Sequence, residues 1–270
     1  MSMKISFSTV GCPHWSWSDI QAAASDLGYQ GIEVRGIGED LFLPDIKIFR
    51  EENWAKACES LKKHNLTIAC LAADVYLHEK DRDVEQDLAK YLALAKGLGV
   101  PGIRVLGDSW GWPGENVDTA LVEARLKALA PAAEKAGVGL WVETNGVYAD
   151  TARLKALLET VSSPAVQAVW DIHHPFRYFG ESVETTVANI GPYIRHVHLK
   201  DADMTDGKIT YKMLGYGSLP VLETLKALKA LDYDGYLSME WVKRWNEGLE
   251  DAGIAFPHFI YQVRNMLQRV

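Results

Sequence analysis

The chain has 270 residues, of which 48% are hydrophobic and 24% are charged, as in an ordinary folded protein. These proportions exclude a disordered or fibrous chain, and no run approaches the roughly 20 apolar residues of a membrane-spanning helix. Lys and Arg number 28 against 36 Asp and Glu, which gives a formal net charge of −8. We therefore expect neither a membrane nor a nucleic acid as partner, because a polyphosphate binder normally carries the opposite charge.

The cysteines and the amino-terminal segment indicate a cytoplasmic protein. Cys12, Cys58 and Cys70 are an odd number of cysteines without CxxC spacing, so we expect reduced thiols rather than disulfides or a thiolate metal site. Residues 1–10 show neither the apolar segment nor the small-residue cleavage site of a secretory signal.

In chain order, short apolar runs alternate with longer helical patterns from one end to the other. The predicted strands are residues 4–10, 31–35, 66–72, 102–107, 139–144, 166–172, 194–200 and 236–241. The predicted helices are residues 18–27, 53–64, 84–98, 117–136, 151–160, 183–190, 219–231 and 253–267. Ser18 and either Asp150 or Thr151 stand where helix N-caps belong, and the expected C-terminal glycines are Gly28, Gly99 and Gly137.

Eight strand–helix units predict an α/β fold, a (β/α)8 TIM barrel, and the length of 270 residues agrees with the usual barrel size of about 250. Strands such as 139–144 and 166–172 are apolar on both faces, as expected when helices cover one side and the barrel interior fills the other. Gly and Pro are scattered at unit boundaries rather than pooled in a linker, so we expect a single domain over residues 1–270. A doubly wound open sheet is the alternative architecture.

Two short patterns resemble catalytic motifs but lack the structural context that those motifs need. Gly97, Gly99 and Gly102 spell GxGxxG, yet they follow a helix and precede a strand, the reverse of a dinucleotide-binding loop. The stretch 107–111 spells GxSxG around Ser109, but Pro and Gly residues follow it instead of the helix that a nucleophile elbow requires. Neither pattern predicts a function here.

Ionisable residues stand at the carboxyl ends of the last four predicted strands: Glu143, Asp171, His198 and Glu240. In a barrel these ends meet at the face where active sites are built. Three converging carboxylates repel one another unless a cation joins them, so the set predicts a divalent metal ion. The oxygen-rich donors favour Mn²⁺ first, with Mg²⁺, Co²⁺ or Zn²⁺ as alternatives. Salt bridges or capping groups at the barrel rim are the competing explanation.

The chain resembles the xylose-isomerase-like barrel superfamily, and the resemblance extends over essentially the whole chain. It is carried by these four residues and by three segments. They are Asp171-Ile-His-His174, His196-Val-His-Leu-Lys-Asp201 and Leu214-Gly-Tyr-Gly217. Within the superfamily the chain is most similar to sugar phosphate isomerases and epimerases, including ketose 3-epimerases. The motifs specify the superfamily well and the substrate poorly.

The resemblance implies that the four strand-end residues are metal ligands and that His174 contacts a substrate oxygen. Lys200 matches the family's HLKD variant and is expected to bind substrate. His173 has no counterpart and is expected behind the ligands or at the rim. Glu33 matches a common second-strand feature whose role varies. Some epimerases carry an Arg shortly after the His ligand, and residues 204–207 contain none, which weakens a specific epimerase assignment.

The same parts predict a reaction on a ketose. The ion would polarise the carbonyl and stabilise an enediolate, while Glu143 and Glu240, on strands five and eight, remove and return the proton next to the carbonyl. Trp15 and Trp112, in loops after strands one and four, are expected to stack on the sugar. The partner is thus a small sugar, phosphorylated or not. A homo-oligomer is compatible with the resemblance, since such barrels often associate through loops around the mouth.

Three other functions are compatible with the fold. A dehydratase of cyclic polyols such as inosose begins with the same proton abstraction and then expels hydroxide. A non-catalytic barrel would keep the metal and bind sugar without turnover. A DNA-repair phosphodiesterase would need more metal ligands and a basic groove, which the charge of −8 disfavours.

Overall fold

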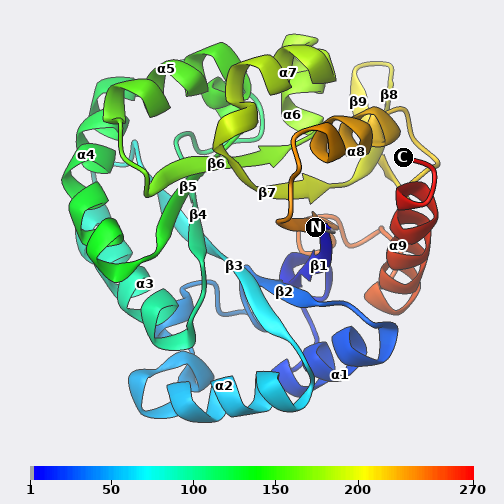
Figure 1. Ribbon diagram of the computed structural model, residues 1–270, viewed down its shortest axis with the longest axis horizontal. Coiled ribbons are helices and arrows are strands. Elements are labelled where there is room, and N and C mark those ends of the chain that lie inside the picture. The colour runs from blue at the N-terminus through cyan, green and yellow to red at the C-terminus, as the bar shows by residue number, and fades with distance from the viewer. Residues whose placement is uncertain (1–2) are drawn as a thin grey trace.

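Eight parallel strands close into a barrel in the computed structural model, which describes residues 3–270 (Figure 1). Around the barrel the strand order is β1-β10-β7-β6-β5-β4-β3-β2. These strands are β1 (Lys4–Ser8), β2 (Gly31–Val34), β3 (Thr67–Tyr76), β4 (Gly102–Leu106), β5 (Gly139–Glu143), β6 (Val166–Asp171), β7 (Ile194–Leu199) and β10 (Tyr236–Met239). The predicted TIM barrel is confirmed, and the doubly wound open sheet is excluded because the sheet has no free edge.

Helices form a ring outside the barrel and cover its apolar outer face (Figure 1). They are α1 (Trp17–Leu27), α2 (Trp54–Lys63), α3 (Val84–Leu98), α4 (Thr119–Ala136), α5 (Thr151–Val161), α6 (His173–Phe179), α7 (Val183–Ile190), α8 (Val221–Ala230) and α9 (Ala252–Leu267). Short 3₁₀ turns occupy Thr9–Gly11, Leu43–Asp45, Lys47–Phe49, Glu51–Asn53, Gly146–Ala149 and Gly191–Tyr193. None of the helices in the described part of the chain is long and apolar enough to cross a bilayer.

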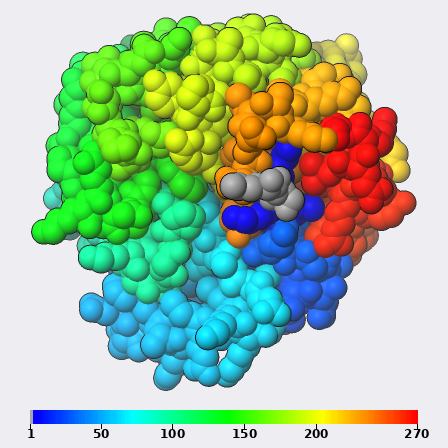
Figure 2. Space-filling view, viewed as in Figure 1, coloured from blue at the N-terminus to red at the C-terminus, as the bar shows by residue number. Residues whose placement is uncertain are grey.

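The first and last helices lie side by side, which completes the ring (Figure 2). The Tyr29 hydroxyl, just after α1, donates a hydrogen bond of 2.7 Å to the carbonyl of Phe256 in α9. The Phe256 ring stacks on Phe7 of β1 with centroids 4.1 Å apart. These contacts join segments that are more than two hundred residues apart and hold β1 beside β10.

The predicted element ends agree with the structure to within two residues, except that β3 continues to Tyr76. One predicted N-cap is wrong. Ser16, not Ser18, caps α1, because its hydroxyl accepts from the amide of Asp19 while the Asp19 carboxylate accepts from the amide of Ser16. Asp150 caps α5 as expected, and the three predicted C-terminal glycines adopt left-handed conformations.

The sequence analysis missed α6 and a hairpin of two antiparallel strands, β8 (Asp201–Thr205) and β9 (Lys208–Lys212). Asp206 and Gly207 form its turn with φ of 49° and 74°, the dihedral sign that two-residue Asp-Gly hairpins require. Asp201 fixes the base of the hairpin, because its carboxylate accepts hydrogen bonds from the amides of Gly215 and Gly217. The hairpin brings Tyr211 to the carboxyl-terminal mouth of the barrel.

Candidate active site and metal centre

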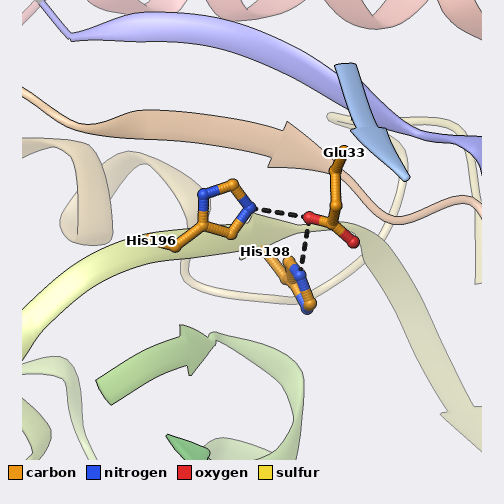
Figure 3. A group of neighbouring side chains, drawn as sticks. All are labelled: Glu33, His196 and His198. Carbon is orange, nitrogen blue, oxygen red and sulfur yellow. Dashed lines mark hydrogen bonds and ion pairs between the residues drawn. The ribbon is translucent and has the colours of Figure 1, made fainter. Parts of the chain in front are cut away.

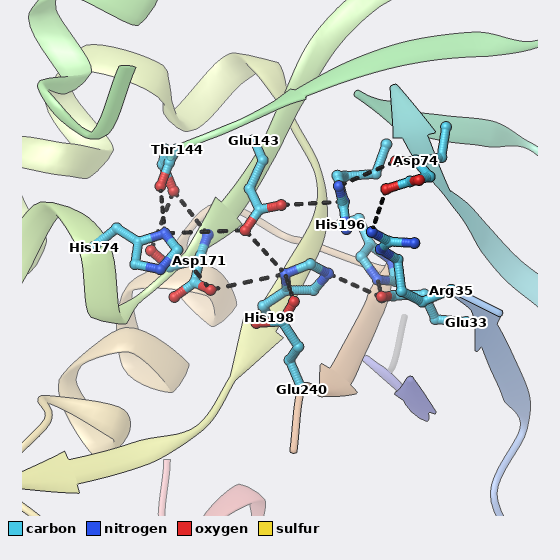
Figure 4. A network of polar contacts seen from close by, with 12 residues as sticks. Glu33, Arg35, Asp74, Glu143, Thr144, Asp171, His174, His196, His198 and Glu240 are labelled. Atoms are coloured by element: carbon cyan, nitrogen blue, oxygen red, sulfur yellow. Dashed lines mark hydrogen bonds and ion pairs between the residues drawn. The ribbon is translucent and has the colours of Figure 1, made fainter. Parts of the chain in front are cut away.

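The four predicted ligands converge at the carboxyl-terminal end of the barrel (Figure 4). Glu143, Asp171 and His198 lie at the ends of β5, β6 and β7, and Glu240 directly follows β10. The register places Asp171 opposite His198 across the β6–β7 pair. One ligand atom from each of the four lies within 4.8 Å of the others, so neighbouring strands deliver the set to one point.

The separations fit a shared cation. His198 Nδ1 lies 3.5 Å from Glu143 Oε1, 3.7 Å from Glu240 Oε1 and 3.8 Å from Asp171 Oδ2. Ligands bound at about 2.1 Å to one ion stand roughly 3 to 3.5 Å apart. Nδ1 is buried and has no hydrogen-bond partner within residues 3–270. A buried ring nitrogen without a partner, facing three carboxylates, fits a divalent ion with oxygen-rich ligands.

Glu33 orients the histidine ligand, a role that the sequence analysis left open (Figure 3). Its Oε2 accepts from Nε2 of His198 at 2.9 Å and from Nε2 of His196 at 2.6 Å, and all three side chains are fully buried. Because a carboxylate only accepts, His198 keeps a proton on Nε2, and Nδ1 is the nitrogen that would bind the cation, which would displace the proton held there in the metal-free protein. This carboxylate–histidine arrangement is typical behind metal ligands. In the sequence, the only sign of this role is that Glu33 is an ionisable residue inside the otherwise apolar second strand.

Two buried cations, Arg104 and Lys200, neutralise part of the acidic charge. Arg104 Nε on β4 lies 3.1 Å from Glu143 Oε2, the oxygen turned away from His198. The Lys200 ammonium lies 2.5 Å from Asp171 Oδ2 and also pairs with Glu240. Lys200, expected to bind substrate, thus contacts two of the ligands while also lining the cavity above them. Arg104 was not predicted, although a lone charge inside a strand signalled it.

The pKa shifts show how strongly the cluster attracts positive charge. Burial alone would raise the pKa of Glu143, but Arg104 and His198 outweigh it and lower the pKa to about 2. Burial would also raise the pKa of Asp171, which His174, Lys200 and His198 hold well below its usual value. Burial lowers the pKa of His198, yet Glu33, Glu240 and Glu143 together raise it well above the ordinary value. Glu143 and Asp171 are therefore ionised and ready to coordinate a cation.

His174 and His173 sit beside the ligands in α6, with different surroundings. His174 Nδ1 donates to the carbonyl of Thr144 at 2.9 Å, which leaves Nε2 as an acceptor beside Gly111 in the cavity wall. This position suits the predicted contact with a substrate oxygen. His173 is fully buried against the rings of Tyr178 and Tyr211 rather than at the rim. Burial and the neighbouring His174 lower its pKa to about 2, so it is neutral.

A cavity of about 450 Å³ opens above the cluster. Trp110 and Trp112 form part of its wall, with rings stacked at 5.2 Å and more than half exposed. Trp112, which the sequence analysis expects to stack on the sugar, lines this cavity. Trp15 is not among the residues that line the cavity; it is half-buried and packs edge-on against Phe256, with 5.7 Å between the ring centroids.

Comparisons with known proteins agree with this architecture. Fructoselysine 3-epimerase of Escherichia coli O157:H7 is 24% identical over 233 residues, which cover 81% of this chain and 83% of that protein. Among solved structures, the IolI protein with a bound zinc atom superposes with a TM-score of 0.79 at 18% identity, covering 99% of both chains. D-psicose 3-epimerase, solved in the presence of D-fructose, superposes with a TM-score of 0.75 at 18% identity, covering 99% of this chain and 98% of that one. The xylose isomerase-like TIM barrel family matches residues 21–256, and the chain belongs to that family.

Proposed function

We propose that the protein is a divalent-metal-dependent epimerase or isomerase of a ketose or ketose phosphate. The observation that carries the proposal is the convergence of Glu143, Asp171, His198 and Glu240, with the unpartnered His198 Nδ1 turned toward the three carboxylates. The family and the similarity to fructoselysine 3-epimerase support a sugar substrate. Mn²⁺ suits the donor set, and Zn²⁺, which is bound in one structural relative, is an alternative.

In this proposal Glu143 and Glu240 act on opposite faces of the bound substrate. Glu143 ends β5 and Glu240 follows β10, and these two strands are separated around the barrel by β6 and β7. When bound, the metal supplies Lewis acidity to the substrate's carbonyl and adjacent hydroxyl oxygens. One carboxylate then removes the proton from the carbon next to the carbonyl, and the other returns a proton to the resulting enediolate. Inversion at that carbon requires two such groups.

Other residues of the site prepare this proton transfer. His174 Nε2 accepts a hydrogen bond from a substrate hydroxyl, since Nδ1 donates its own hydrogen bond to the Thr144 carbonyl. Arg104 pairs with Glu143 and helps to lower its pKa, and Lys200 pairs with Glu240. A lowered pKa makes Glu143 a weaker base, so acidification of the substrate C–H must supply much of the rate. Trp110 and Trp112 line the cavity, and we expect them to exclude water from the reacting carbons when a substrate is bound.

The experiment is to strip the protein of metal, restore Mn²⁺ in D₂O, and follow a panel of ketoses and polyol ketones by NMR. The proposal predicts solvent deuterium at the carbon next to the carbonyl, with epimer or aldose formation. Exchange should be lost without metal and reduced at least about 100-fold in Glu143→Gln and Glu240→Gln. Loss of water from the substrate would instead identify a dehydratase. Tight binding without exchange would identify a sugar-binding barrel, and full turnover by both variants would refute the two-base mechanism.

A further inference from the structure

Tyr211 brings a phenol hydroxyl to the mouth of the barrel, and the proton transfer described above does not use it. Tyr211 lies in β9, directly opposite Ala202 of β8, and its side chain lines the cavity above the metal cluster. Residues opposite one another in an antiparallel pair share a face, and Ala202 is fully buried, so this face of the hairpin is turned toward the barrel. The Tyr211 ring also lies 6.1 Å from the ring of His173, between centroids, and is thus held between the hairpin and α6.

The Tyr211 hydroxyl is free and accessible. It makes no hydrogen bond within residues 3–270, and it is not one of the inaccessible polar atoms that lack a partner in that part of the chain. Because the half-buried side chain lines the cavity, the hydroxyl is open to a ligand there. Phenylalanine would make the same ring contacts, so packing alone does not explain the hydroxyl. By contrast, the Ser109 hydroxyl in the same wall is already bonded to His78 at 2.6 Å.

The hairpin that carries Tyr211 is fixed at its base by Asp201. This carboxylate is buried and accepts hydrogen bonds from four backbone amides, those of Ala202, Gly215, Gly217 and Leu219. A donor that is held in place before a reaction stabilises developing negative charge without a cost of reorganisation. Tyr211 is therefore presented on a rigid support.

The neighbouring charges suit a neutral donor at this place. Burial raises the pKa of Tyr211 above its ordinary value; Lys200 opposes this shift, and Glu240 and Asp171 add to it. The hydroxyl therefore keeps its proton near neutral pH. A neutral hydroxyl supplies a hydrogen bond without adding a positive charge that would repel a metal ion.

Given the proposed function, we propose that the Tyr211 hydroxyl donates a hydrogen bond to an enediolate oxygen of the reacting ketose. Negative charge develops on these oxygens when the carbon next to the carbonyl loses its proton, and it disappears when a proton returns to that carbon. The hydrogen bond therefore strengthens as the enediolate forms and weakens afterwards. Tyr211 keeps its own proton throughout, so the step needs no further acid or base. In this proposal Tyr211 is a catalytic residue in addition to the two glutamates.

Binding of glycolohydroxamate to the Mn²⁺-loaded protein tests this contact without a known substrate. Two adjacent oxygen atoms and a negative charge make the deprotonated compound resemble an enediolate. In titration calorimetry, Tyr211→Phe should bind it about 10- to 100-fold more weakly than the parent, as expected when a hydrogen bond to a charged group is lost. The Kd for Mn²⁺ should stay within about twofold of the parent. Equal glycolohydroxamate affinity in both proteins, no binding by the parent, or a weakened Mn²⁺ site in the variant would overturn the proposal.

Tyr216→Phe is the matched control, because Tyr216 follows the same hairpin, is 68% exposed and does not line the cavity. It should bind Mn²⁺ and glycolohydroxamate like the parent. With the ketose that exchanges deuterium fastest in the panel described above, Tyr211→Phe should lower kcat at least about tenfold and change KM by less than about threefold, because the hydrogen bond is strongest in the transition state.

The two measurements separate this contact from the proposed function. Weaker glycolohydroxamate binding by Tyr211→Phe, with no ketose exchanged by the parent, would refute the proposed function and support the contact. Deuterium exchange by the parent, with an equal rate and equal glycolohydroxamate affinity in Tyr211→Phe, would refute the contact alone.

Discussion

Replacing Glu33 with Gln tests whether the residue behind the histidine ligand sets metal affinity. Glu33 Oε2 accepts from two buried rings, His198 at 2.9 Å and His196 at 2.6 Å. Gln keeps the shape but is neutral, and its single carbonyl oxygen cannot replace a charged acceptor for both rings. Such changes typically cost about 10- to 100-fold in metal affinity, or roughly 1.4 to 2.7 kcal/mol.

The assay is calorimetric titration of metal-stripped protein with Mn²⁺. The Glu33→Gln variant should retain one site per chain with a Kd raised by that factor. Glu159→Gln, on the exposed face of α5, makes the same change of charge far from the site and should bind like the parent. An unchanged Kd in Glu33→Gln, with folding verified by thermal melting, would refute the orienting role of Glu33.

Three further predictions concern the charges around the cluster. Removing metal with a chelator should lower the free energy of unfolding by about 2.7 kcal/mol relative to protein at about one hundred times the Kd, measured by urea denaturation; no difference would mean that no ion binds the native state. Arg104→Met should lower the free energy of unfolding by about 3 to 5 kcal/mol, because it leaves Glu143 buried without its partner. Adding Glu143→Gln should recover part of the loss. If Arg104→Met alone left the free energy of unfolding unchanged, the pairing would be contradicted. Lys200→Met should bind Mn²⁺ about tenfold more tightly, since roughly 1.4 kcal/mol of repulsion on the incoming cation is removed. Weaker binding would show instead that Lys200 holds the ligands in place.

The sequence predicted the barrel and the ligand set for a simple physical reason. Parallel strands alternate with helices, so each strand end is delivered to the same face, and an ionisable residue at a strand end stands out against apolar neighbours. Glu143, Asp171 and His198 were recognised in this way, and the structure brings them together.

The roles that were missed or left open depend on contacts across the barrel rather than on local pattern. Glu33 and His198 are 165 residues apart in sequence, and nothing near either one indicates that they meet. Arg104 faces Glu143 only because β4 and β5 pair in the observed register. The β8–β9 hairpin was missed for a different reason. Its Asp206-Gly207 turn is visible in the sequence, but its two short strands are polar and lack the apolar residues by which the barrel strands were found.

Trp15 illustrates a limit of placing aromatic side chains from loop position alone. It follows β1, as a residue at the mouth of the barrel would, but the neighbouring α9 supplies Phe256 as a packing partner. Its position was therefore decided by a helix from the other end of the chain, which no local pattern encodes.

Anomalous diffraction from crystals grown with Mn²⁺ tests the central claim most directly. The account predicts one strong peak per chain, about 2 to 2.3 Å from oxygen atoms of Glu143, Asp171 and Glu240 and from Nδ1 of His198. A structure with Mn²⁺ bound elsewhere, or with the four side chains turned away from one another and no ion between them, would contradict it.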